Sequence, residues 1–175
     1  MLSIGTGRRQ ATMTQARSAV NEEEARDLWS VNERRHTMSE QFEAACLCGK
    51  IKLSYSGVIG PANYCHCADC RRVTGSAFNI GVRVDRKDLK ITASAELRSY
   101  KSVSGKGREI ERCFCGTCGS PIYTLHVDVP EFAWVKAGII NEPEVVKPAF
   151  ENWTKDKVTW ATIRVAASYE ETRPA

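Results

Sequence analysis

The chain contains the segment CHCADCRRVTGS at residues 65–76, which places three cysteines within six residues. Two further cysteine groups flank it, CLCG at residues 46–49 and CFCGTCG at residues 113–119. All eight cysteines of the 175-residue sequence fall in these three groups. Cysteines this concentrated indicate either a disulfide framework or a set of metal ligands, and the surrounding sequence helps to decide between them.

The rest of the sequence favours metal ligands. Disulfide scaffolds are typically short secreted chains, whereas this chain is longer and its first residues are not followed by the apolar stretch of a secretory signal. No segment approaches the ~18 consecutive apolar residues of a membrane span. We therefore expect a cytoplasmic protein without a membrane partner, in which the cysteines are thiols or metal ligands.

The spacing of the cysteines is typical of zinc sites. A zinc ion binds thiolates in a tetrahedron with Zn–S distances near ~2.3 Å, and a CxxC turn brings two sulfurs close enough to share one ion. One CxxC is a weak signal, but here each of two CxxC pairs follows another cysteine, and a separate CxC is also present.

Spacing alone leaves two arrangements open. The eight thiolates can form two closed four-cysteine sites, or one closed site, one three-cysteine site with an open position, and one spare thiol. The difference matters because an open coordination position distinguishes a catalytic zinc from a structural one.

Length and composition indicate one folded domain. The 175 residues fall in the ~100–200 range of a single domain, and a hydrophobic content of 42% is enough for a core. The net charge of +4 is too small to argue for a nucleic-acid partner by itself.

Short strands are the dominant pattern in the middle of the chain. Apolar and polar residues alternate over 51–55, 78–84, 89–93 and 123–129. Residues 104–107 are typical of a turn between two strands, and 132–140 are almost continuously apolar. Residues 68–72 lack alternation and predict a helical turn or two. We expect a mainly β domain over 41–165.

The two ends of the chain differ from this domain. Residues 1–20 contain three arginines and no acid, and Asn21 followed by three glutamates is typical of a helix start. We expect a flexible extension over residues 1–40 with a short helix at 22–35. Residues 166–175 show no usable pattern and are expected to form a tail.

The order of the motifs resembles the glutathione-dependent formaldehyde-activating enzyme (GFA) family, also called the CENP-V/GFA domain. The matching motifs are CxCG at 46–49, CHCxxCRRxTGS at 65–76 and FCxxCGS at 114–120. The resemblance implies an Mss4-like fold of several coiled antiparallel β-sheets around two zinc sites. It also implies which cysteines bind each ion: a structural zinc on Cys46, Cys48, Cys115 and Cys118, and a second zinc on Cys65, Cys67 and Cys70.

The resemblance also implies an enzyme. In the family's namesake reaction glutathione thiolate adds to formaldehyde and gives S-(hydroxymethyl)glutathione, formally a carbon–sulfur lyase reaction run in reverse. Cys65, Cys67 and Cys70 would hold the reactive zinc, and a free position on such a zinc can deprotonate a thiol or polarise an aldehyde. Arg71 and Arg72 are candidates for binding a glutathione carboxylate, and the alternative for both is a solvated basic turn.

Cys113 departs from the family motif, which does not require a cysteine two residues before Cys115. On a strand, its side chain would share the face of Cys115. Two interpretations stay open. Cys113 is either a small buried side chain or a fourth ligand that closes the second zinc site and makes it structural.

The histidines and tryptophans carry weaker signals. His66 lies between two ligands and is expected to point away from the metal, and His126 falls on the polar face of its strand. We expect both to be surface or half-buried side chains. Trp134, Trp153 and Trp160 are expected to pack in the core, with one of them a candidate for lining a substrate cleft.

The main alternative to an enzyme is a non-catalytic, zinc-stabilised binding module of the CENP-V type with a chromatin or cytoskeletal partner. A basic surface would favour it. However, seven thiolates and two Zn²⁺ lower the formal charge from +4 to about +1, so a nucleic-acid partner is not expected. A methionine sulfoxide reductase, which shares the Mss4-like scaffold, would need a catalytic cysteine outside the metal clusters, and the sequence has none.

Overall fold

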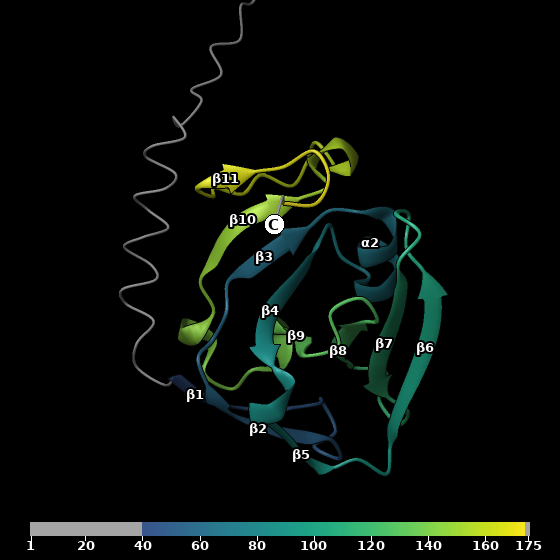
Figure 1. Cartoon of the computed structure of the whole chain (residues 1–175), viewed down its shortest axis with the longest axis vertical. Coiled ribbons are helices and arrows are strands. Elements are labelled where there is room, and N and C mark those ends of the chain that lie inside the picture. The colour runs from purple at the N-terminus through teal and green to yellow at the C-terminus, as the bar shows by residue number, and fades with distance from the viewer. Residues whose placement is uncertain (1–39, 174–175) are drawn as a thin grey trace, which may run out of the picture.

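The computed structural model describes residues 40–173, so the predicted extension and its helix at 22–35 lie outside the described residues. The described residues form two β-sheets and one short α-helix (Figure 1), which confirms the mainly β prediction. The smaller sheet has the strand order β1-β2-β5. Its strands are β1 (Glu40–Ala45), β2 (Lys52–Gly57) and β5 (Leu89–Ala93).

The larger sheet has eight strands in the order β11-β10-β3-β4-β9-β8-β7-β6. In chain order they are β3 (Ala62–Cys65), β4 (Asn79–Asp85), β6 (Leu97–Val103), β7 (Glu109–Cys115), β8 (Pro121–His126), β9 (Phe132–Lys136), β10 (Pro148–Asn152) and β11 (Ala167–Ser168). The helix α2 (Ala68–Thr74) follows β3, as the lack of alternation after Cys67 predicts. Four short 3-10 helices complete the described part: η1 (Arg86–Asp88), η2 (Ala137–Ile139), η3 (Pro143–Val145) and η4 (Thr154–Asp156). Within residues 40–173, no helix has the length and apolar composition to cross a membrane.

The expected antiparallel pairing holds for the described strands except at one edge of the large sheet. There β10 pairs in parallel with both β3 and β11. Parallel strands need a long crossover connection, and the chain builds β4 to β9 before it returns to pair β10 with β3. Two residues of the segment expected to be a tail, Ala167–Ser168, form β11 and extend this edge.

The two sheets pack against each other through alternate residues of their strands. Phe42, Leu53 and Tyr55 of the small sheet are at most 2% exposed, and they share one hydrophobic core with Val82 and Val135 of the large sheet. Successive residues of a strand point to opposite faces of its sheet. The large sheet therefore has a second face that does not contact the small sheet, and Figure 1 shows this sheet curving around the middle of the molecule.

The chain between the two sheets passes close to β4 at Gly60. The Gly60 amide donates a hydrogen bond to the carbonyl oxygen of Arg83 at 2.9 Å, and a Cβ atom at Gly60 would lie 2.8 Å from that same oxygen. Because backbone cannot move aside as a flexible side chain can, we expect Gly60→Ala to lower the free energy of unfolding by about 1–3 kcal/mol. Urea denaturation measures this loss. Gly138→Ala is the control, since a Cβ there meets nothing within 4 Å, and equal stability of the two variants would contradict the close approach at Gly60.

Candidate functional site

Four cysteines meet where the two sheets adjoin, and we call them the four-cysteine group. Cys46 and Cys48 follow β1 of the small sheet, whereas Cys115 ends β7 and Cys118 lies in the turn to β8. Their sulfur atoms all lie within 4.8 Å of one another. The Cys46 and Cys48 sulfurs are 3.5 Å apart, and those of Cys48 and Cys115 are 3.7 Å apart. These separations fit a tetrahedral metal ion, whose thiolate sulfurs are about 3.8 Å apart.

The turns of the four-cysteine group explain its glycines. Gly49 and Gly119 have φ angles of 72° and 74°, in the left-handed region that favours glycine. The amide of Gly49 donates to the carbonyl oxygen of Cys46 at 2.9 Å, which closes the turn around the first two sulfurs. The hydroxyl of Ser120 lies 3.3 Å from the Cys118 sulfur, and this hydrogen bond lowers the pKa of Cys118 to about 5. This hydrogen bond therefore favours the thiolate form of Cys118.

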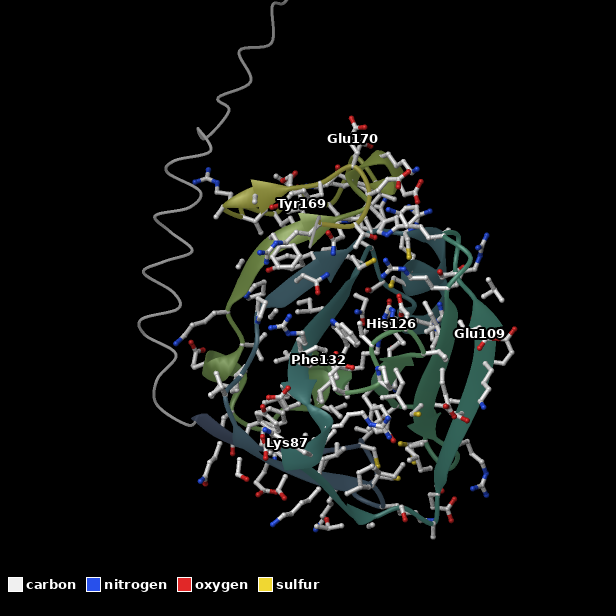
Figure 2. The ribbon with its side chains drawn as sticks, viewed as in Figure 1. Lys87, Glu109, His126, Phe132, Tyr169 and Glu170 are labelled. Atoms are coloured by element: carbon white, nitrogen blue, oxygen red, sulfur yellow. The ribbon has the colours of Figure 1, made fainter. Side chains whose placement is uncertain are left out.

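Three further cysteines come together at the start of α2, and we call them the three-cysteine group. Cys65 ends β3, Cys67 caps the helix and Cys70 lies within it. Their sulfur atoms also lie within 4.8 Å of one another, with 3.6 Å between those of Cys65 and Cys67. Hydrogen bonds from the thiols of Cys65 and Cys70 lower the pKa of Cys67 to about 2. Figure 2 shows the sulfur atoms gathered in two separate places, one beside α2 and the other beyond the end of β7.

A buried network anchors the loop that carries the three-cysteine group. His66 is 0% exposed, so the expectation of a surface or half-buried histidine is wrong for this residue. Its Nε2 lies 2.9 Å from a carboxylate oxygen of Glu151 in β10. Glu151 also accepts hydrogen bonds from Lys157 Nζ at 2.8 Å and from Ser168 Oγ at 2.6 Å. Because His66 lies between Cys65 and Cys67, its contact with Glu151 ties the cysteine-bearing loop to β10, and Ser168 of β11 supports Glu151.

The three-cysteine group opens onto a cavity of about 440 Å³. The cavity lies on the second face of the large sheet and is lined by alternate residues of its strands. Asn79, Gly81 and Arg83 come from β4, and Phe132, Trp134 and Lys136 come from β9. None of the cysteines of the four-cysteine group lines it. The two cysteine groups thus differ in their surroundings as well as in their number of thiols.

The cavity wall is rich in basic and aromatic side chains. Arg112 Nη2 lies 3.4 Å from the Asp69 carboxylate, and the His126 ring packs 4.4 Å from the Trp134 ring. Figure 2 labels His126 and Phe132 in the middle of the concave space. Burial lowers the pKa of His126, so its imidazole is neutral at neutral pH.

Residues 41–156 match the family described as glutathione-dependent formaldehyde-activating enzyme. The chain belongs to this family. Its membership confirms the resemblance carried by the three cysteine motifs. A crystal structure of a Rhodobacter sphaeroides protein is similar to this chain with a TM-score of 0.48 and 23% sequence identity, covering 61% of this chain and 96% of that chain. No significant match is found among proteins with curated functions.

In this GFA-family chain, the two arginines expected to bind substrate do not line the cavity. Arg71 donates from Nη1 to the carbonyl oxygen of Asp156, and Arg72 is exposed. From this segment the cavity is lined by Cys67, Ala68, Asp69, Cys70 and Val73. The hydrogen bond to Asp156 holds the Arg71 guanidinium, so Arg71 lies against a cavity residue without lining the cavity itself.

Cys113 belongs to neither cysteine group. It lies in the hydrophobic core with Cys115, as expected for two residues on one face of a strand, and burial raises its pKa. Arg112, the preceding residue, lines the cavity from the opposite face of β7. The structure therefore supports the buried-thiol interpretation of Cys113 and not the fourth-ligand interpretation.

The sequence did not single out Arg112, Lys136 or Asn79 as cavity residues. The available signal was the polar half of each alternating strand, which here faces the cavity. Of the tryptophans, Trp134 and Trp153 line the cavity and Trp160 is 75% exposed. The expectation of core packing is therefore wrong for these three, while the expectation that one lines a cleft is met twice.

Each cysteine group is expected to hold one metal ion, and single substitutions test this. Cys48→Ala should lose one ion per chain and lower the melting temperature by about 10 °C or more, because the four-cysteine group joins the sheets. Cys67→Ala should lose one ion with a smaller change in melting temperature. Cys113→Ala, the matched control, should keep two ions. Elemental analysis and thermal melts provide the measurements, and loss of an ion from Cys113→Ala would restore the fourth-ligand interpretation.

Proposed function

We propose that this chain is a zinc-dependent enzyme that joins a small thiol to an aldehyde, with glutathione and formaldehyde as the reference pair. One observation carries the proposal: the four-cysteine group is a complete ligand set away from the cavity, whereas the three-cysteine group is one thiol short and lines the cavity. Membership of a family named for such an enzyme supports the reaction class.

Zinc fits both cysteine groups by the chemistry of their donors. Each group offers only thiol sulfurs, which soft or borderline metals such as zinc prefer. Each also contains a cysteine whose pKa lies below the usual range, Cys118 in one and Cys67 in the other. Zinc in the three-cysteine group would supply an electrophilic position that binds the substrate thiol as a thiolate.

The size and charge of the cavity indicate the kind of thiol. A volume of about 440 Å³ suits an organic molecule rather than formaldehyde alone, since small-molecule sites commonly span ~300–1,000 Å³. Arg83, Arg112 and Lys136 place positive charge in the wall, which attracts an anionic ligand. Glutathione carries two carboxylates that are ionised at neutral pH.

In the proposed reaction, the substrate sulfur forms a bond to the carbonyl carbon and the carbon–oxygen π bond opens. The thiol loses its proton, and the oxygen gains one. His126 is a neutral base in the cavity wall that can accept the thiol proton. Phe132 and Trp134 contribute apolar surface to the wall of the same cavity. A cytoplasmic location belongs to the same proposal, because a reducing compartment keeps the cysteines as thiols.

Exchange spectroscopy by NMR tests the function. Zinc-loaded protein with glutathione and formaldehyde should exchange the free and adduct forms faster than the spontaneous reaction does. Cys67→Ala should fall to the spontaneous rate because it removes a thiol from the three-cysteine group, and Cys113→Ala should match the unsubstituted protein. Absence of any acceleration would remove the namesake reaction and favour the alternative of a zinc-stabilised binding module of the CENP-V type.

A further inference from the structure

Lys136 is a buried lysine in the cavity wall. Lys136 is only 7% exposed, and its Nζ donates a hydrogen bond to Asn79 Oδ1 at 2.9 Å. Among residues 40–173, no carboxylate lies within ion-pair distance of it. A buried charge without a charged partner is costly, so the surroundings of Lys136 favour an anion beside it.

The other basic side chains of the wall already have contacts that Lys136 lacks. Arg112 pairs with Asp69 at 3.4 Å, Arg108 pairs with Asp128 at 3.2 Å and Lys106 pairs with Glu171 at 2.8 Å. The Arg83 guanidinium lies 4.8 Å from the centre of the Phe132 ring. Lys136 is therefore the buried basic group of the wall that has no carboxylate partner among residues 40–173.

The position of Lys136 relates it to the three-cysteine group. Asn79 of β4 faces Cys65 of β3. On the other side of β4, Lys136 of β9 faces Gly81, two residues along the strand from Asn79. Facing residues on adjacent strands have Cβ atoms about 4.5–5.5 Å apart. Because Lys136 Nζ contacts the Asn79 side chain, it lies beside the thiols, on the same wall of the cavity. Burial lowers the pKa of Lys136, and the thiolates of Cys70, Cys65 and Cys67 oppose this shift.

We propose that Lys136, oriented by Asn79, binds the carboxylate of a thiol ligand whose sulfur enters the three-cysteine group. An ammonium has three donors, and Asn79 takes one of them. The remaining donors select thiols that carry a carboxylate a few bonds from the sulfur, in preference to neutral thiols. The inference rests on the proposed function for the place of the sulfur, but it does not depend on the aldehyde step.

The test compares two thiols that differ in the carboxylate. Metal-loaded protein is titrated with mercaptoacetate and with 2-mercaptoethanol, and binding is followed by NMR chemical shifts. The unsubstituted protein should prefer mercaptoacetate by about tenfold or more, as expected for a charge-assisted hydrogen bond. Lys136→Met should lose this preference. Lys106→Met is the matched control, since it removes a lysine of the same wall that already pairs with Glu171, and it should keep the preference.

Asn79→Asp provides a second variant in which Lys136 is present. The new carboxylate would take the place of the amide oxygen now 2.9 Å from Nζ, neutralise the ammonium and abolish the preference for mercaptoacetate. This variant decides the question if Lys136→Met does not fold. Retention of the preference in both variants would overturn the proposal. Loss of a metal ion from a folded Lys136→Met would also overturn it, because Lys136 would then serve the charge of the thiolates.

The titrations contain neither aldehyde nor glutathione, so they separate this inference from the proposed function. A preference that depends on Lys136, together with no acceleration of the exchange reaction, would support the carboxylate site and reject the enzyme. Accelerated exchange without any role for Lys136 in selecting the thiol would support the enzyme and reject the carboxylate site.

Discussion

Four thiols connect the first strand of the small sheet to the turn between β7 and β8 of the large sheet. The connection brings together residues 67 positions apart in the chain, Cys48 and Cys115. Bringing them together costs chain entropy, which must be offset either by a shared metal ion or by packing of the core. The hydrophobic core around Leu53, Val82 and Val135 adjoins this junction. With the small sheet fixed on one face, the large sheet is free to curve around a cavity on the other.

The two faces of the large sheet explain why neighbouring residues have different roles. Cys113 lies in the core and Arg112 lines the cavity, although they are adjacent on β7. The same alternation places Val82 in the core and Gly81 and Arg83 in the cavity. A strand of this sheet therefore contributes to stability through one set of residues and to the candidate site through the other.

The sequence predicted what depends on local spacing. The CxC and CxxC turns bring sulfurs together within a few residues, so each local cysteine motif was accessible from spacing, as was the helical turn after Cys67. The grouping of Cys46 and Cys48 with Cys115 and Cys118 came from the family resemblance, because spacing left it open. The cavity was not accessible, because its wall depends on strand order: β4 lies between β3 and β9, which are far apart in sequence. For this reason the sequence singled out Arg71 and Arg72, which follow Cys70 directly, and not Lys136, which lines the cavity together with the three-cysteine group.

The anchoring of His66 by Glu151 and Ser168 has a consequence for assembly. The four-cysteine group needs the chain only as far as Cys118, whereas the loop of the three-cysteine group is held by residues as late as Ser168. During synthesis from the N-terminus, the first group is complete some fifty residues before the second has its support. The junction that holds the fold therefore forms early, and the thiols that face the cavity are fixed last.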